Sequence, residues 1–280
     1  MAFLIINSKL IDEEQGMISV RDRGFRYGDG VFETMAVYKG VAYQLNWHLA
    51  RLSASLKAVR IDFDVTSILD PCRALLLQNN VEEGLLRITI SRGLGGRGYS
   101  PDRNTPPTYV IETLPMPPRW RKPVFLWKSQ YERISPTALP IRYKLSQGLN
   151  STLARIEAED HECLDALQLN GKGEICETSS ANIFWLKDDI LYTPALDCGV
   201  LEGATRATIL RISPYPVKEV MALLSELAEA KAVCICNSVW GILPVTLLKP
   251  NGYYWESGKL AKQLQDLLTM DIEMYAETIR

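Results

Sequence analysis

The feature that most constrains the fold is a proline-rich stretch near the middle of the chain. Leu114 to Arg121 reads Leu-Pro-Met-Pro-Pro-Arg-Trp-Arg. Proline lacks an amide donor and favours extended geometry in the residue before it, so this stretch is a poor helix or central strand. We therefore predict that residues 116–122 link two domains, a smaller one at 1–115 and a larger one at 123–280.

Helix-like and strand-like segments occur on both sides of this stretch. Val31–Tyr38 alternates as a half-buried strand does, and the leucines of residues 48–59 recur at helical spacing. The predicted helices are residues 48–59, 68–77, 150–161, a stretch from 201–206 through 212, and 220–230. The predicted strands are residues 3–6, 10–11, 18–20, 31–38, 41–45, 85–90, 109–113, 124–128, 164–169, 175 onward, 181–186, 190–193 and 233–236. This mixture indicates an α+β or mixed α/β protein of two domains.

Composition excludes several classes of function. The net charge is −2, from 31 basic and 33 acidic residues, which gives no overall field for nucleic acid or an anionic membrane. Two histidines without companions at ligand spacing disfavour a metal site. Six scattered cysteines without a CxxC pair predict buried free thiols and a reducing cytosol. The apolar N-terminus stops at Asn7, too short for a signal or a membrane span, so we expect a cytoplasmic protein.

A glycine-rich loop follows the predicted strand 85–90. Gly93 to Gly98 matches the G-x-G-x-x-G pattern of dinucleotide-binding proteins, with Glu112 beyond it. That motif requires a helix start directly after the glycines. The residues that follow are Tyr-Ser-Pro-Asp-Arg-Asn-Thr-Pro-Pro, so we reject a nicotinamide oxidoreductase. A flexible surface loop remains open, as does a substrate loop in which Arg92 and Arg97 bind a carboxylate.

Lys144 lies at a junction between predicted elements. It stands between the apolar Leu139 and Leu145, after a proline and before a predicted helix. Lysine is seldom buried without a partner. Lys144 is therefore either a Schiff-base nucleophile held in a site or a surface lysine whose stem packs on apolar neighbours.

Three other segments have features that suit one cofactor. Gly203–Arg206 opens a helix with small residues, which suits a phosphate or an ordinary helix start. His48 and Arg51 share a helix face, where Arg51 reaches either a phosphate or a surface acid. Glu177 lies in a bend of small residues. A carboxylate there either is solvated or keeps a pyridine nitrogen protonated, as in pyridoxal phosphate enzymes.

In their order along the chain, these segments resemble the fold-type IV pyridoxal-phosphate enzymes, also called class IV aminotransferases. That family includes branched-chain aminotransferases, D-amino-acid aminotransferases and aminodeoxychorismate lyases. The resemblance runs from Arg21 to about Val245 through six segments: Asp22–Thr34, His48-x-x-Arg51, Lys144, Glu177–Asn182, Gly203–Arg206 and Asn237–Val245. It implies a two-domain fold like that of D-amino-acid aminotransferase, in which the larger C-terminal domain binds pyridoxal 5'-phosphate. It also implies a small amino substrate, a cofactor between the domains, and a homodimer whose partner subunit closes the site.

The resemblance also implies roles for single residues. Lys144 would be the catalytic Schiff-base lysine, and Glu177 the partner of the pyridine nitrogen. The further cofactor-binding residues that it implies are Arg51, Gly203, Ala204, Thr205, Asn237 and Ser238. The substrate-binding residues that it implies are Thr34, Arg92, Arg97 and Tyr99. A protein that binds the cofactor without turnover is disfavoured, because the lysine, the glutamate and the phosphate-binding segments are all present.

The glycine-rich loop favours one branch of the family. Ser91–Ser100 is similar to the S-R-G-x-G-G-R-G-Y run of aminodeoxychorismate lyases, and Ile235–Ser238 resembles their I-C-N stretch. Many lyases, however, have an asparagine three residues after the catalytic lysine, where this chain has Gln147. The resemblance implies a lyase of folate biosynthesis that converts 4-amino-4-deoxychorismate to p-aminobenzoate and pyruvate. The alternative is an aminotransferase that acts on D-amino or branched-chain amino acids with 2-oxoglutarate or pyruvate.

Overall fold

The computed structural model of the chain describes residues 2–120 and 122–279. Contacts between Cα atoms divide the chain into two units. Unit 1 comprises the residues up to Pro117, Tyr143–Gly148 and the residues from Met274 onward, and unit 2 comprises Pro118–Arg142 and Leu149–Glu273. The division falls within the predicted linker 116–122, of which residue 121 lies outside the described residues. Tyr143–Gly148 and the residues from Met274 onward differ from the predicted boundaries, because they group with unit 1.

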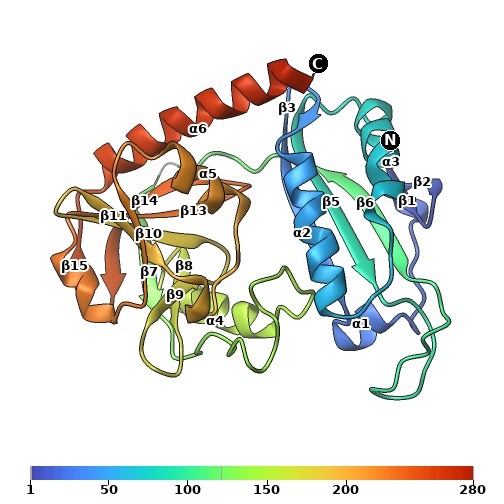
Figure 1. Cartoon of the computed structure of the whole chain (residues 1–280), viewed down its shortest axis with the longest axis horizontal. Helices are drawn as coiled ribbons and strands as arrows, with labels where there is room; N and C mark the ends of the chain where they lie inside the picture. The colour runs from blue at the N-terminus through green and yellow to red at the C-terminus, as the bar shows by residue number, and fades with distance from the viewer. Residues whose placement is uncertain (1, 121, 280) are drawn as a thin grey trace. The chain divides into compact units, whose positions relative to one another are not determined.

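Unit 1 is built on a six-stranded antiparallel sheet in the order β2-β1-β6-β5-β3-β4 (Figure 1). Its strands are β1 (Phe3–Ile6), β2 (Lys9–Asp12), β3 (Gly30–Tyr38), β4 (Val41–Ala42), β5 (Glu83–Ser91) and β6 (Thr108–Leu114). Its helices are α1 (Arg23–Tyr27), α2 (Leu45–Ala58) and α3 (Leu69–Gln78), with 3-10 turns η1 (Glu13–Gln15) and η2 (Val65–Ile68).

The core of unit 1 lies between one face of this sheet and the helices α2 and α3. Alternation along β3 directs Val31 and Met35 to the same face, where both are fully buried. The helical stripe of α2 buries Leu52 and Leu56 against them. The alternation and the leucine spacing in the sequence predicted both elements.

Unit 2 is built on a nine-stranded mixed sheet in the order β12-β11-β10-β13-β14-β7-β8-β9, with β15 paired to β14. Its strands are β7 (Val124–Lys128), β8 (Asp165–Leu169), β9 (Ile175–Thr178), β10 (Asn182–Lys187), β11 (Ile190–Pro194), β12 (Val217–Val220), β13 (Ala232–Asn237), β14 (Gly241–Lys249) and β15 (Tyr253–Tyr254). The pairs β8–β9 and β10–β11 are antiparallel.

Among the described residues, three α-helices begin in unit 2: α4 (Leu149–Asp160), α5 (Ala204–Ile212) and α6 (Gly258–Ile279), of which the residues from Met274 group with unit 1. The buried face of α4 consists of Ala154 and Ala158, whereas the larger Leu149 and Ile156 are exposed. Small residues at this face allow the helix to approach β7 and β8 closely.

Three local predictions are wrong. Residues 220–230 do not form an α-helix: β12 (Val217–Val220) pairs with β11, and only a 3-10 helix, η4 (Leu224–Glu229), follows. The prediction rested on apolar residues at helical spacing. These residues do not form one buried face, because Met221 and Leu223 are exposed whereas Leu227 is buried. Residues 18–20 are not a strand, and the strand predicted at 41–45 ends at Ala42 because α2 begins at Leu45.

All six cysteines are free and buried, as the sequence predicted. Cys72 lies in unit 1 and the other five lie in unit 2. Burial raises the pKa of the Cys72 thiol to about 12, which makes it unreactive in the folded state. Within the described part of the chain, no helix has both the length and the apolar character that crossing a bilayer requires.

Candidate functional site

Lys144 is held at the beginning of strand β3 in unit 1. Its main-chain oxygen accepts a hydrogen bond from Phe32 N at 3.0 Å, and Ser146 N donates to Gly30 O at 2.9 Å. The segment thereby pairs with β3. Lys144 Nζ lies 4.5 Å from the centroid of the Phe32 ring, a cation–π distance. These contacts hold Lys144 against the sheet. Its side chain is therefore more restricted than that of a lysine that moves freely on a surface.

Glu33 forms a buried ionic cluster with two residues of α2, His48 and Arg51. Arg51 donates to Glu33 through Nε and Nη2, each at 2.6 Å, and His48 Nδ1 lies 2.7 Å from Glu33 Oε2. The spacing of three residues on α2 brings His48 and Arg51 to one face, as predicted. Glu33 was not among the site residues that the sequence predicted. Its place among the inward-facing positions of an alternating strand was the available signal.

The charge state of this cluster follows from its surroundings. Burial would raise the pKa of Glu33, but the charge of Arg51 and the hydrogen bonds from His48 and Arg51 outweigh burial and lower it to about 2. Burial lowers the pKa of His48, against the opposing effect of Glu33, and the charges of Arg51 and Lys144 lower it further. At neutral pH the cluster is an ionised Glu33–Arg51 pair with a neutral His48.

Replacing Glu33 with glutamine is expected to reduce the stability of the protein by about 3–5 kcal/mol at pH 7, because Arg51 keeps its buried charge without a counter-charge. Folding lowers the pKa of Glu33 from 4.5 to about 2. The contribution of the carboxylate is therefore complete above pH 4.5 and is lost as the pH falls towards 2. Urea denaturation of the wild type and Glu33→Gln across this range checks the prediction.

The control for this prediction is Glu112→Gln. Glu112 forms a partly exposed ion pair with Arg87 at 3.6 Å, and its loss should change stability by less than about 1 kcal/mol. A difference between wild type and Glu33→Gln that stays constant from neutral to acidic pH contradicts the role given to Glu33.

The glycine-rich loop after β5 keeps the character expected from its sequence. Residues 99–107, all of which are described, contain no helix start. Arg97 and Tyr99 are exposed, and the main chains of Arg97 and Ser100 bond to each other in a tight turn. Thr34 is half-buried on β3, and alternation places it on the same face as Phe32.

Arg92 differs from Arg97 because its guanidinium donates hydrogen bonds to other residues of unit 1. Nε and Nη2 donate to the Asp29 carboxylate at 2.8 and 2.9 Å, and Nη1 and Nη2 donate to the main-chain oxygens of Arg60 and Val59. All three nitrogens thus have acceptors within unit 1. This arrangement favours Arg97 over Arg92 as a group that meets a substrate.

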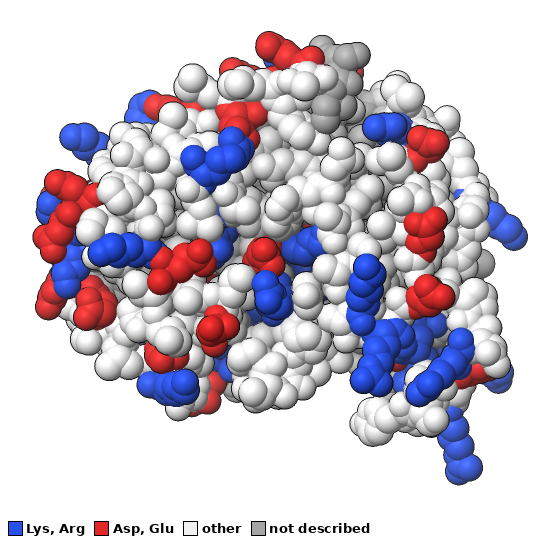
Figure 2. Space-filling model, in the orientation of Figure 1, with Lys and Arg blue, Asp and Glu red and all other residues white. Residues whose placement is uncertain are grey.

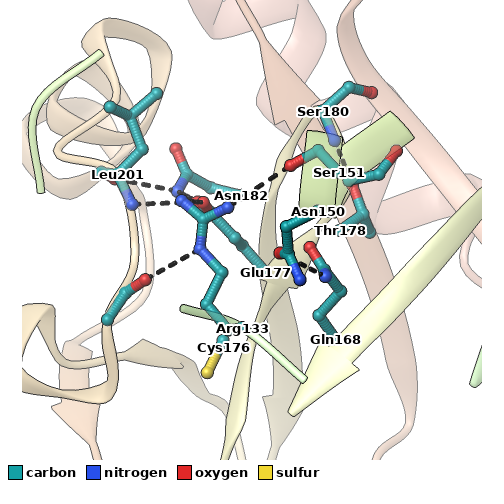
Figure 3. Close-up of polar contacts among 12 residues, drawn as sticks. Arg133, Asn150, Ser151, Gln168, Cys176, Glu177, Thr178, Ser180, Asn182 and Leu201 are labelled. Carbon is teal, nitrogen blue, oxygen red and sulfur yellow. Dashed lines mark hydrogen bonds and ion pairs between the residues drawn. The ribbon is translucent and has the colours of Figure 1, made fainter. Parts of the chain in front are cut away.

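Glu177 lies on β9 in unit 2, and three groups hold its buried carboxylate (Figure 3). Arg133 Nη2 lies 2.6 Å from Oε1. Asn182 Nδ2 and Leu201 N donate to Oε2 at 2.9 and 3.0 Å. A buried carboxylate is costly without such partners, so the ion pair with Arg133 preserves the negative charge of Glu177.

Arg133 also belongs to this site, although the sequence did not predict it. Its Nε donates to Gly199 O at 3.0 Å and its Nη1 to Ser151 Oγ at 3.5 Å (Figure 3). Each nitrogen of Arg133 therefore contacts a different segment around Glu177. A buried glutamate requires a cation, but nothing in the sequence indicates which arginine of the chain supplies it.

The start of α5 offers main-chain donors in the same unit. Gly203 is the N-cap residue, and it makes no side-chain capping bond. The first amides of a helix lack partners within the helix. Ala204 and Thr205 are buried here, and the positive end of the helix dipole adds to their attraction for an anion such as a phosphate.

Replacing Gly203 with alanine is expected to lower the thermal midpoint of unfolding by several degrees, because the added Cβ introduces about 1–3 kcal/mol of strain. A Cβ at Gly203 would overlap Asn182 Oδ1, while Asn182 Nδ2 is held by Glu177 and Leu201 O. The matched control is Gly171→Ala, where a Cβ meets only Glu132 Oε2 at 3.5 Å. Equal midpoints of the two variants would contradict the prediction.

Asn237 and Ser238 lie where β13 ends in a turn. Asn237 Oδ1 accepts from Val239 N and Trp240 N at 3.0 and 2.8 Å, and its Nδ2 donates to Ser180 O at 3.2 Å. The Asn237 side chain thus shapes the turn and ties it to the bend after Glu177. Ser238 is half-buried in that turn.

Comparison with known proteins gives the family. The sequence matches the model for amino-transferase class IV over residues 30–248. The chain belongs to the class IV aminotransferase family. It is 32% identical to an aminodeoxychorismate lyase of Vibrio harveyi, with 90% of this chain and 95% of that protein covered. It is 31% identical to a putative branched-chain-amino-acid aminotransferase of Methanocaldococcus jannaschii, with 86% of each covered.

The fold agrees with this family. The solved structure of 4-amino-4-deoxychorismate lyase from Pseudomonas aeruginosa resembles this class IV chain with a TM-score of 0.85 at 30% identity, over 96% of this chain and 99% of that one. The predicted mixed α/β fold and the resemblance to fold-type IV enzymes are therefore confirmed.

As a class IV enzyme the protein uses pyridoxal 5'-phosphate, and both units contain residues whose chemistry suits this group. In unit 2, the uncapped start of α5 suits the phosphate, and the paired carboxylate of Glu177 suits a protonated ring nitrogen. In unit 1, Lys144 supplies an ordered amine and Arg51 a buried cation. The structure brings Lys144, Arg51 and Thr34 into one unit and Glu177, Gly203–Thr205 and Asn237 into the other.

Proposed function

We propose that this enzyme is a lyase that converts 4-amino-4-deoxychorismate to p-aminobenzoate and pyruvate. The observation that carries the proposal is the loop Ser91–Ser100, which has the run typical of aminodeoxychorismate lyases and exposes Arg97 and Tyr99. Figure 2 shows basic side chains gathered over the part of unit 1 where Figure 1 has α1 and this loop. The exposed arginines of these segments include Arg26, Arg97 and Arg103. Such a group favours a substrate that carries carboxylates.

The residues of both units receive roles in this proposal. Lys144 attaches the cofactor covalently and takes the proton from the substrate carbon that bears the amino group. Glu177, with its charge preserved by Arg133, stabilises a proton on the ring nitrogen. The residues proposed to bind the phosphate are Arg51, Gly203, Ala204, Thr205, Asn237 and Ser238. The residues proposed to bind the substrate are Thr34, Arg97 and Tyr99.

Bound pyridoxal phosphate supplies an electron sink for the negative charge that develops at this carbon. Lys144 removes the proton, and the C–O bond to the enolpyruvyl group breaks. The enolpyruvate that leaves takes up one proton and becomes pyruvate, and the ring, which has lost a proton and this group, is the aromatic ring of p-aminobenzoate. Arg97 holds a substrate carboxylate through charge-assisted hydrogen bonds during this step.

The test is a comparison of substrates on the purified, cofactor-loaded protein. We expect p-aminobenzoate and pyruvate to form in equal amounts from 4-amino-4-deoxychorismate. We expect no comparable glutamate formation from D-alanine or L-leucine with 2-oxoglutarate. Glutamate formation without p-aminobenzoate would overturn the lyase proposal in favour of transamination.

Transamination is the second candidate, and two observations favour it. The relative from Methanocaldococcus jannaschii is about as similar as the lyase from Vibrio harveyi. Gln147 also stands where many lyases have an asparagine. The role proposed for Lys144 as the group that moves the proton is the same in both reactions.

We further propose a cytoplasmic homodimer. Family membership supports the dimer, as do large apolar side chains exposed on unit 1, among them Met17, Val20 and Phe25. Six unpaired thiols suit a reducing compartment. The molar mass from light scattering on the protein, measured as it elutes from a size-exclusion column, tests the dimer. A monomeric mass would contradict it.

A further inference from the structure

Arg23, the first residue of α1, contacts both ends of the glycine-rich loop. Arg23 N donates to Gly93 O at 2.9 Å, and Arg23 Nη1 donates to Gly98 O at 3.0 Å. The residue is 4% exposed. One buried side chain with its own amide therefore spans the loop from its first glycine to its last.

Asp29 supplies the counter-charge and connects Arg23 to Arg92. Its Oδ2 accepts from Nε of both arginines, each at 2.8 Å, and its Oδ1 accepts from Arg92 Nη2 at 2.9 Å. Burial would raise the pKa of Asp29, but the two arginines outweigh burial and lower it. We name Arg23, Asp29 and Arg92 the loop clamp. The clamp joins α1, the beginning of β3 and the end of β5.

The loop itself is folded closely onto this clamp. Gly93 and Gly96 have φ values of +82° and +80°, and a Cβ at either would overlap the main chain of Pro106 or Ser100. The Tyr99 ring lies 5.6 Å from the ring of Tyr27 on α1. The glycines, the clamp and the ring contact together define where the tip of the loop lies.

We propose that Arg23 is a positioning residue for substrate selection, which holds Gly93 and Gly98 so that Arg97 meets a carboxylate of the amino substrate. The inference rests on the proposed role of Arg97 in binding. Arg23 donates into the loop and to Asp29, so its influence is on substrate binding and leaves the cofactor residues unchanged. The clamp therefore selects amino substrates that carry a carboxylate within reach of the loop.

Replacing Arg23 with glutamine is expected to raise KM for 4-amino-4-deoxychorismate about tenfold, because a misplaced Arg97 loses part of its charge-assisted hydrogen bond to the substrate. We expect kcat to change less than about twofold and the affinity for pyridoxal phosphate to stay constant, since only binding of the substrate is affected. Asp29→Asn, an isosteric change, should act in the same direction. Arg73→Gln is the control, because Arg73 lies on α3 of the same unit, where it forms an exposed ion pair with Asp70 and has no role in the loop.

A double-substitution cycle separates positioning from a general structural role. If Arg23 acts through Arg97, the variant with both Arg23→Gln and Arg97→Gln should have the KM of Arg97→Gln alone. Hydrogen exchange of residues 93–100 should rise in Arg23→Gln and stay near wild type in Arg73→Gln. Additive effects on KM, or unchanged exchange in the loop, overturn the proposal. A joint loss of cofactor affinity and thermal stability in Arg23→Gln overturns it too.

Failure of the proposed function has a different signature. The wild-type enzyme would then release no p-aminobenzoate, and the same cycle would be measured on D-alanine or L-leucine with 2-oxoglutarate. A tenfold rise in KM for the amino acid, again absent from the Arg97→Gln background, supports the clamp without the lyase. An unchanged KM overturns the clamp.

Discussion

Replacing Lys144 with alanine is expected to lower turnover of 4-amino-4-deoxychorismate by at least about 10⁴-fold, because one amine both attaches the cofactor and moves the proton. The fold should tolerate the change. The bond from Phe32 N goes to the main chain of Lys144 and survives truncation of the side chain. Fluorescence of p-aminobenzoate measures turnover. Borohydride reduction of the cofactor-loaded protein, followed by peptide mapping, should label Lys144 in the wild type.

Two variants serve as controls. Lys144→Arg keeps the positive charge near Phe32 but lacks a primary amine, so it should be as inactive as the alanine variant. Lys57→Ala removes an exposed lysine at the end of α2 and should leave turnover unchanged. Wild-type turnover in Lys144→Ala, or a borohydride label on another lysine, would remove Lys144 from the catalytic role.

Replacing Glu177 with glutamine is expected to lower kcat by about 10²–10³-fold, the range seen when one preorganised electrostatic group is lost. The amide keeps the shape of the side chain but removes the negative charge. It also leaves the Nη2 of Arg133 facing a neutral group. The steady-state rate and the pH dependence of the absorbance of the bound cofactor test this expectation.

Glu174→Gln is the matched control for Glu177→Gln. Glu174 lies three residues earlier, and its Oε2 accepts from Asn170 Nδ2 at 2.7 Å. Its carboxylate therefore stabilises the turn between β8 and β9. Arg133→Gln should act in the same direction as Glu177→Gln, because a buried carboxylate without its cation favours the protonated form. If Glu177→Gln had the wild-type rate and spectrum, Glu177 would not be the partner of the ring nitrogen.

Much of the fold could be predicted because hydrophobic periodicity and burial agree in most elements. The alternation in β3 and the leucine spacing in α2 correspond to buried faces in the structure. Residues 220–230 failed because pairing of β12 with β11 overrode the local helical pattern. The C-terminal helix α6 was not predicted, although Leu260, Leu264 and Leu268 repeat at helical spacing and are all buried.

The candidate site could be predicted only where family motifs mark single residues. Lys144 and Glu177 stand in such motifs. Arg133 lies in none of these segments. Glu33 lies within the family segment Asp22–Thr34 but was not marked as a site residue, because the importance of both residues comes from contacts with side chains distant in the sequence. Arg92 was expected to meet the substrate from its residue type and from the family resemblance. Its three nitrogens bond within unit 1, a fact that residue type cannot reveal.

The buried cysteines of the two units can be used to measure the local unfolding of each unit. Cys72 is fully buried in the core of unit 1, and Cys234 and Cys236 are buried in β13 of unit 2. A thiol reagent can modify each only after local or global unfolding exposes it. The rate at which mass spectrometry detects label on the Cys72 peptide, compared with the Cys234–Cys236 peptide, therefore measures the opening of the two units separately, without any engineered probe.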